Sequence, residues 1–472
     1  MTRAEKISQK ENLTEGPLFL RLLFFTLPLI ATSVLQLLFN TADIVVVGRW
    51  GGDTPLESAN SLAAVGSCST LIALLVNLFF GISAGVGVCV ANDIGAGKIE
   101  RIEKTIQTSI ITALISGGLV TAVGILFCRP MLQAMGTDIS VLDEAAVYMC
   151  AYLVGMPANM LYNFCSSILR AKGDTVRPLL FLSVAGVVNV LFNLLTVIVF
   201  RWGALGVGVA TAASQWVSCV LIVFYMMKMD GVCRLDMRKL GVDSECLRRI
   251  LYQGLPAGFQ SLLFSVSNVL VQAAVNSFGP IVVAGNTAAG NLDGYIWVSQ
   301  NSLYHAALTF VSQHMGAQKF QRMKKVIGYC AILVTAVGLT LGSVMFLFRE
   351  PLLRIYAPDN TAVVEAGMVR LKVMCTTYFL CGLMEVGSGT LRGLGKSISS
   401  MLISMFGACA VRLFWIYTVF YAVVGMGVAQ EQSLTVLFLS YPVAWILTIL
   451  ILFSFAGVYL HKLITMQKKG YL

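Results

Sequence analysis

The residues best placed to do chemistry are polar side chains that lie inside long apolar stretches. Asp43 lies in one such stretch, Asn189 and Asn193 in another, and Thr211 in the next. Residues four apart share one face of a helix, so the two asparagines face the same way. A carboxylate with amide and hydroxyl oxygens supplies the hard ligands that suit Na⁺. The same carboxylate can instead take up a proton, because burial disfavours its charge. These four residues are the predicted cation-coupling site.

Two plainer interpretations of this set stay open at the level of sequence. Asp43 can be a partly hydrated carboxylate near the end of its helix, paired with Arg49. Asn189 and Asn193 can simply hydrogen-bond to neighbouring helices.

A second set of charged residues lies in apolar stretches of the second half of the chain: Asp293, Glu385 and Arg412. Charges within a membrane span are costly, and by default they mark a transport pathway or an ion site. Arg412 can neutralise one of the two carboxylates as a structural ion pair. Alternatively, a carboxylate that faces a cleft can contact a cationic substrate. The sequence does not decide between these alternatives.

The elements that must position these residues are transmembrane helices. The 472 residues are 57% hydrophobic and only 12% charged, whereas a soluble domain carries about a quarter charged residues. A helix crosses a bilayer with about 20 apolar residues, and lipid admits only helices or closed barrels. Strand-like alternation is absent from the sequence. We therefore expect twelve helices, at 18–47, 58–91, 102–128, 141–169, 175–200, 204–228, 247–278, 281–315, 326–348, 361–391, 397–421 and 433–460.

The net charge of +10 reflects membrane topology rather than nucleic-acid binding. Lys and Arg concentrate in alternate connections, so the positive-inside rule places those connections and both termini in the cytoplasm. We expect a multi-pass protein of the cell (plasma or inner) membrane. The apolar run after the first sixteen residues is a full span, so no cleavable signal peptide is predicted.

Internal repeats divide the chain into two halves of six spans. Ile94–Lys98 recurs as Met315–Lys319, and Leu27-Pro28 recurs as Leu255-Pro256. Six is an even number, so the two halves are parallel and related by an axis along the membrane normal. The matched prolines Pro28 and Pro256 are predicted kinks or hinges, since membrane helices tolerate proline.

The predicted organisation follows from these halves. We expect a cytoplasmic N-terminal segment, an N-lobe with spans 1 to 6, a cytoplasmic linker, a C-lobe with spans 7 to 12 and a cytoplasmic tail, at 1–16, 17–229, 230–246, 247–461 and 462–472.

The chain resembles the multidrug and toxic compound extrusion (MATE) transporters over essentially its whole length. Five segments carry the resemblance together: Thr41–Gly48, Leu169–Asp174, Gly203–Thr211, Gly254–Pro256 and Leu391–Gly395. The resemblance implies an all-α, V-shaped membrane fold of twelve helices in two six-helix lobes. It also implies export of organic cations, driven by entry of Na⁺ or H⁺.

The first-lobe cation site of this family has an Asp on span 1, an Asn and an Asp four apart on span 5, and a Thr on span 6. Asp43, Asn189 and Thr211 match that pattern, whereas Asn193 stands where many members have Asp. The site would then hold one carboxylate, and one charge per transport cycle is the simpler expectation.

Members with an ion site in the second lobe have acidic residues on spans 7 and 10. Span 7 has none here, and Glu385 lies on span 10. The residues predicted to line a substrate cleft are Glu385, Asp293, Gln260, Asn268, Gln272 and Arg412.

The predicted function is antiport of a drug-like organic cation against Na⁺ or H⁺ by alternating access of the two lobes. A lipid-linked saccharide flippase of the same superfamily is the alternative. The loop after span 2 lacks the motif of major facilitator transporters. Sequence patterns for nucleotide binding and for metal- or serine-dependent catalysis are missing too, so we expect neither a pump nor an enzyme. The predicted partners are the substrate and the lipid bilayer, with no cofactor and no nucleic acid, and the protein is predicted to be a monomer.

Overall fold

The computed structural model describes residues 13–52, 54–358 and 360–470, and within them every regular element is a helix. Residues 1–12 of the predicted N-terminal segment and residues 471–472 of the predicted tail lie outside the described residues. Twelve long helical segments follow one another, as the sequence predicts.

The chain divides into two compact units. Among the described residues, unit 1 comprises Leu13 and 27–258, and unit 2 comprises 14–26 and 259–470. The divisions fall inside two helices, α2 and α9, beside Pro28 and Pro256. Both helices continue through their prolines. The predicted lobe boundaries and the hinge role of the prolines stay predictions.

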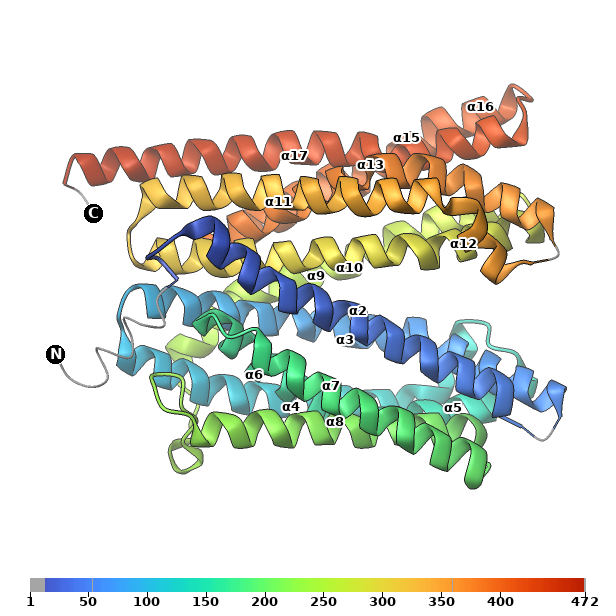
Figure 1. Cartoon of the computed structure of the whole chain (residues 1–472), viewed down its shortest axis with the longest axis horizontal. Helices are drawn as coiled ribbons and strands as arrows, with labels where there is room; N and C mark the ends of the chain where they lie inside the picture. Colours follow the sequence, from blue (N-terminus) through green and yellow to red (C-terminus); the bar gives the residue numbers. More distant parts are fainter. Residues whose placement is uncertain (1–12, 53, 359, 471–472) are drawn as a thin grey trace. The chain divides into compact units, whose positions relative to one another are not determined.

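Most of the first six helical segments build unit 1 (Figure 1). They are α2 (Leu18–Trp50), α3 (Pro55–Gly95), α4 (Ile99–Ala134), α5 (Ile139–Leu153) with α6 (Met156–Lys172), α7 (Val176–Asn193) with the π-helical turn η1 (Leu194–Val199), and α8 (Gly203–Lys228). A short 3₁₀ turn, η2 (Met237–Lys239), lies in the connection to α9. In unit 1, α6 packs on α4 and on α8, α7 packs on α8, and α3 packs on α4, α5 and α6 (Figure 1).

Unit 2 contains the remaining helices. They are α9 (Ser244–Asn276), α10 (Pro280–Gly316), α11 (Phe320–Leu347), α12 (Arg349–Tyr356), α13 (Thr361–Gly393), α14 (Ser397–Ser404), η3 (Met405–Ala410), α15 (Val411–Trp415), η4 (Ile416–Phe420), α16 (Tyr421–Gly425) and α17 (Gln430–Lys468). The run from α14 to α16 is one span interrupted by two π-helical turns. In Figure 1, α11, α13 and α17 run along one another, and α13 packs most extensively on α10.

Nine helices among the described residues are long and apolar enough to cross a membrane, and the bent pair α5 and α6 makes ten. The two other predicted spans are α10 and α13, which carry more polar side chains. Their packing against each other shelters those side chains, so two helices of lower hydropathy fit among ten apolar ones.

Close approach of backbones fixes several helix crossings, and glycine permits it. A Cβ at residue 81 would lie 2.1 Å from the Gly258 nitrogen, and one at residue 85 would lie 2.6 Å from the Gly254 nitrogen. Small residues at such crossings let membrane helices pack tightly. The first part of α9 is thereby held against α3 within unit 1.

An ion pair anchors the same part of α9. Arg249 donates from both terminal nitrogens to the carboxylate of Asp93, at 3.0 Å each, and Asp93 is buried. In unit 2, the start of α2 has comparable anchors: Lys319 donates to the Thr14 hydroxyl at 2.9 Å and Arg322 to the Gly16 carbonyl at 2.6 Å.

Candidate functional site

Four residues from three helices of unit 1 meet around one carboxylate. The Asn193 amide nitrogen donates to Oδ1 of Asp43 at 2.5 Å and to the Asn189 side-chain oxygen at 3.3 Å. The Asn189 amide nitrogen lies 3.5 Å from the Thr211 hydroxyl, and that hydroxyl also lies beside the Asp43 carboxyl group. The structure therefore brings together all four residues of the predicted cation-coupling site.

Local packing explains why α2 and α7 approach closely enough for this contact. A Cβ at residue 186 would lie 1.8 Å from the ring of Phe39. Only glycine at position 186 lets the Phe39 ring sit against α7. Phe39 lies one helical turn before Asp43 on α2, so this contact sets the depth of the carboxylate beside the asparagines.

The helix carrying the two asparagines changes its winding immediately after them. The π-helical turn η1 begins at Leu194, and such turns are rare and frequent at functional sites. Thr196 in this turn donates to the Gly206 carbonyl at 2.9 Å, which ties α7 to α8 and so to Thr211.

One buried oxygen of the set has no hydrogen-bond partner. It is Oδ1 of Asn193, whose residue is fully buried. A buried carbonyl oxygen without a donor is costly, and a cation or a water beside it would satisfy it. Within the described part of the chain, no group of three His, Cys, Asp or Glu residues is arranged to hold a metal ion. The side-chain oxygens that meet around Asp43 are one carboxylate, two amide oxygens and one hydroxyl, which are hard ligands of the kind that Na⁺ takes.

The predicted cleft residues of unit 2 fall into three separate groups. In the first, Arg370 donates from Nε to Oδ2 of Asp293 at 2.9 Å and from Nη1 to the Asn286 side-chain oxygen at 2.8 Å. Asn286 in turn donates to Gln272 at 2.9 Å. Asp293 is buried, so this is a sheltered ion pair extended by two amides.

In the second group, Arg392 of α13 contacts side chains of α9 and α10. It donates from Nη2 to the Gln260 side-chain oxygen at 2.7 Å, and from Nη1 to the Tyr304 hydroxyl. Glu385 lies near enough to interact electrostatically with this guanidinium. The side chain of Arg392 is buried, although the sequence assigns it to a cytoplasmic connection.

The third group surrounds Arg412 and corrects one of the two sequence alternatives. Arg412 donates from Nη1 to the Asn268 side-chain oxygen at 2.9 Å and to the Ser267 hydroxyl at 3.2 Å. The cations that interact with the two carboxylates are Arg370 for Asp293 and Arg392 for Glu385. The structural ion pair expected for Arg412 is therefore wrong, because α15 directs Arg412 toward α9 rather than toward either carboxylate.

The sequence does not single out Arg370 or Arg392, because both resemble the basic residues of helix ends and loops. A signal was present for Arg370, which lies ten positions into the predicted span 361–391. A charge at that depth needs a partner. The sequence carries no such signal for Arg392, because this residue lies in the last turn of α13. Its side chain is buried only because it points into the protein.

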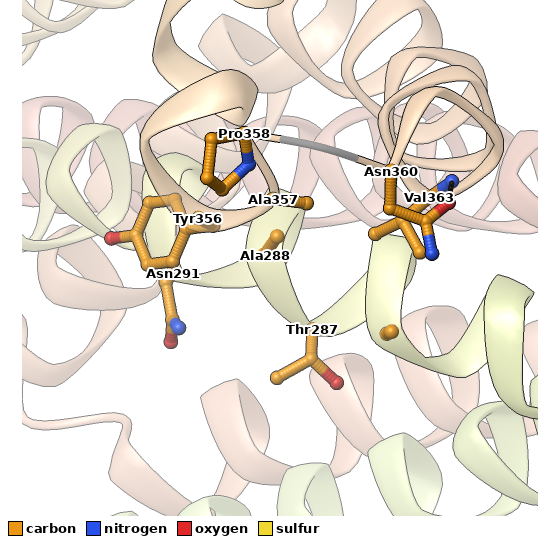
Figure 2. A pocket seen from close by; sticks show the side chains of 9 residues that line it. Thr287, Ala288, Asn291, Tyr356, Ala357, Pro358, Asn360 and Val363 are labelled. Atoms are coloured by element: carbon orange, nitrogen blue, oxygen red, sulfur yellow. Dashed lines mark hydrogen bonds between the residues drawn. The ribbon is translucent and has the colours of Figure 1, made fainter. Parts of the chain in front are cut away.

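A cavity of about 580 Å³ opens where α10, α12 and the start of α13 meet (Figure 2). Its lining includes Thr287 and Asn291 from α10 and Tyr356 from α12. The described lining residues carry no carboxylate or cationic side chain.

Comparison with known proteins places the chain in a family. The MatE family model matches residues 28–195 and 256–418. The chain belongs to the MatE family. The match covers both repeated halves, and it includes Asp43, Asn189 and Asn193. The resemblance inferred from the five sequence segments is confirmed.

Relatives and solved structures agree with this assignment. The chain is 27% identical over 440 residues to the probable multidrug resistance protein YoeA of Bacillus subtilis, with 91% of this chain and 92% of that protein covered. It is 24% identical to the probable multidrug resistance protein NorM of Thermotoga maritima, with 83% of each covered. An outward-facing multidrug resistance MATE transporter superposes with a TM-score of 0.87 at 18% identity, covering 98% of this chain and 99% of that one. The fold is therefore that of MATE membrane transporters, and the protein is a transporter rather than an enzyme.

Proposed function

We propose that this protein exports drug-like organic molecules in exchange for Na⁺ or H⁺, and that Asp43 carries the coupling cation. Membership of the MatE family and the names of the multidrug resistance relatives support export of such molecules. The protein would lie in the plasma membrane of its cell with both termini in the cytoplasm, as the distribution of Lys and Arg indicates. The preference for organic cations stays a prediction from the resemblance.

The observation that carries the proposal is the setting of the Asp43 carboxylate. It receives a 2.5 Å hydrogen bond from Asn193, and the unsatisfied Asn193 oxygen lies on the same side chain. Asp43 as a residue is half-buried, whereas Asn193 is fully buried. A carboxylate that is held in place by neutral groups can gain and lose one cation per cycle.

Coupling follows if the cation and the substrate favour different states of the transporter. A bound ligand shifts an equilibrium between conformations only by its difference in affinity for them. Neutralising Asp43 removes the cost of a charge within the span, so cation binding changes which arrangement of α2, α7 and α8 is stable. We propose one charge per cycle, since Asp43 is the only carboxylate in the four-residue set.

The test is transport in proteoliposomes with Na⁺ and pH gradients imposed separately. Ethidium efflux should depend on one of the two gradients, and Asp43→Asn should reduce that gradient-driven efflux to the level of empty liposomes. Asp230→Asn is the matched control, because Asp230 is exposed in the connection after α8. Unchanged efflux by Asp43→Asn at equal protein incorporation would refute the assigned role. The gradient that drives transport identifies the ion.

A further inference from the structure

Arg412 is a cation inside unit 2 whose charge no described carboxylate compensates. Arg370, Arg392 and Arg412 are three arginines of unit 2 that lie within its described helices. Two of them have an acidic neighbour, namely Asp293 beside Arg370 and Glu385 beside Arg392. Arg412 is only 5% exposed, and its hydrogen-bond partners are the neutral side chains of Ser267 and Asn268. A buried charge without a counter-charge is strongly unfavourable, so a reason for its presence is required.

The contacts of the guanidinium show which of its donor nitrogens make no hydrogen bond to the described part of the protein. Its flat face lies over the ring of Tyr441, with Cζ 4.1 Å from the ring centroid. Both hydrogen bonds of Arg412 use Nη1, and Nε is buried without a partner. The edge formed by Nε and Nη2 therefore makes no hydrogen bond to any described group. That edge is a fork of parallel donors, which matches the two oxygens of a carboxylate or phosphate.

Arg370 provides an internal comparison within the same unit. It uses the corresponding edge to hold a carboxylate, since its Nε and Nη2 both lie 2.9 Å from Oδ2 of Asp293. The Nε and Nη2 donors of Arg370 are thus paired with a carboxylate of the protein, whereas the same two donors of Arg412 are unpaired among the described residues.

The backbone around Arg412 is also unusual. The π-helical turn η3 ends just before α15, the five-residue helix that carries Arg412, and η4 begins just after it. π-Helical turns are frequent at functional sites because they redirect side chains. In unit 1, the turn η1 likewise follows directly on Asn193.

A hydrogen bond links the guanidinium to an exposed residue of α9. Asn268, which accepts a hydrogen bond from Nη1, is exposed, while the neighbouring Ser267 is buried. A group that reaches Asn268 from outside unit 2 is therefore one side chain away from Arg412.

We propose that Arg412, with Ser267 and Asn268, binds the acidic group of the transported molecule, a carboxylate or a phosphate. This inference deepens the proposed function and rests on it. The substrate would be an organic acid or a zwitterion rather than a simple organic cation. A zwitterion also satisfies the predicted preference for a cationic group.

The test compares two dyes that differ only at the acidic group. Rhodamine 110 has a free carboxylate, and rhodamine 123 is its methyl ester. Binding to the purified full-length protein is measured by fluorescence anisotropy, with no ion gradient. The wild type should bind the acid at least about tenfold more tightly, as expected for a hydrogen-bonded charge pair.

Three variants define the role of the side chain. Arg412→Gln should bring the two affinities within about threefold of each other and leave ester binding unchanged, as the loss of one charged hydrogen-bonded pair predicts. Arg412→Lys should give an intermediate ratio, because an ammonium lacks the fork. Arg354→Gln is the matched control: it removes one positive charge from unit 2 at an exposed position paired with Glu350, and it should keep the wild-type ratio.

Several results would overturn the proposal. They are equal binding of the two dyes by the wild type, an undiminished preference in Arg412→Gln, and displacement of rhodamine 110 by millimolar inorganic phosphate, which would identify a free-anion site. If Arg412→Gln does not fold, an undiminished preference in Arg412→Lys overturns it instead. Asp43→Asn should retain the dye ratio, so failure of the coupling proposal and failure of this one are distinguishable.

Discussion

The side-chain amide of Asn193 donates to the carboxylate of Asp43 at 2.5 Å, across 150 positions of sequence. Asn193 is fully buried, whereas Asp43 is half-buried. The buried amide therefore fixes one oxygen of the Asp43 carboxylate. We expect Asn193 to matter to the proposed coupling site through this hydrogen bond.

Removing this amide should impair transport while leaving the carboxylate in place. We expect Asn193→Ala to lower gradient-driven efflux about tenfold, because a hydrogen bond to a charged group contributes about 1.5–3 kcal/mol. The measurement is initial efflux rate in proteoliposomes. Asn163→Ala is the control, since Asn163 bonds only within α6, to Asn159 at 3.0 Å. Equal losses in the two variants would point to general destabilisation instead.

Adding a second carboxylate at the site should change the number of charges carried. Asn193→Asp places a new acidic group within hydrogen-bond distance of Asp43, and two adjacent carboxylates cannot both stay ionised without a cation between them. We expect one additional cation per cycle. Reversal-potential measurements in proteoliposomes give the stoichiometry directly, and an unchanged value would contradict the single-carboxylate account of the wild type.

Breaking the ion pair of unit 2 should destabilise the protein more than removing both partners. Asp293→Asn leaves the guanidinium of Arg370 without its counter-charge in a sheltered position. Such a loss costs about 3–5 kcal/mol, whereas replacing both charges is often neutral. Thermal unfolding in detergent should show a large drop for Asp293→Asn and recovery in Asp293→Asn with Arg370→Met.

An exposed ion pair serves as the comparison for that experiment. Arg129 and Asp143 pair at 2.6 Å with exposed side chains. Asp143→Asn should change stability by less than about 1 kcal/mol. A drop as large as that of Asp293→Asn would mean that burial does not set the difference.

Two glycines of α3 should respond in opposite directions to the same substitution. Gly81→Ala places a methyl group 2.1 Å from the Gly258 backbone nitrogen, so α3 and α9 must separate, at about 1–3 kcal/mol. Gly66→Ala meets nothing within 4 Å and should stabilise the helix by about 0.5–1 kcal/mol. Unfolding midpoints in detergent check both signs, and lower stability of both variants would contradict the packing argument.

The contribution of Asp243 to stability should depend on pH. Asp243 precedes α9 and accepts a hydrogen bond from the Cys246 backbone nitrogen at 2.9 Å, and this bond lowers the pKa of its carboxyl group. A carboxyl group with a lowered folded-state pKa stabilises the fold above its ordinary pKa of about 3.9. That contribution is lost as the pH falls through the folded-state value. Asp243→Ala should therefore lower the unfolding midpoint at pH 7, and the difference from wild type should shrink in acid.

The sequence by itself determined the spans and the family. A membrane helix satisfies its own backbone within the segment, so local composition is enough to locate it, and all twelve predicted spans coincide with helical segments. Polar side chains within apolar stretches predict a cation site at Asp43, Asn189, Asn193 and Thr211. The repeats and motifs carry the resemblance to the family.

Only the tertiary structure decided which charged groups meet. Asp293 pairs with Arg370 and not with Arg412, and Arg392 turns inward from the end of α13. These outcomes depend on the rotation of each helix about its axis and on backbone contacts such as that of Gly81 with Gly258. Hydropathy leaves that rotation undetermined, because lipid and protein are similarly apolar surroundings for a helix. Long-range packing of polar side chains sets the rotation of each helix. The same packing leaves the Nε and Nη2 donors of Arg412 without a partner among the described residues.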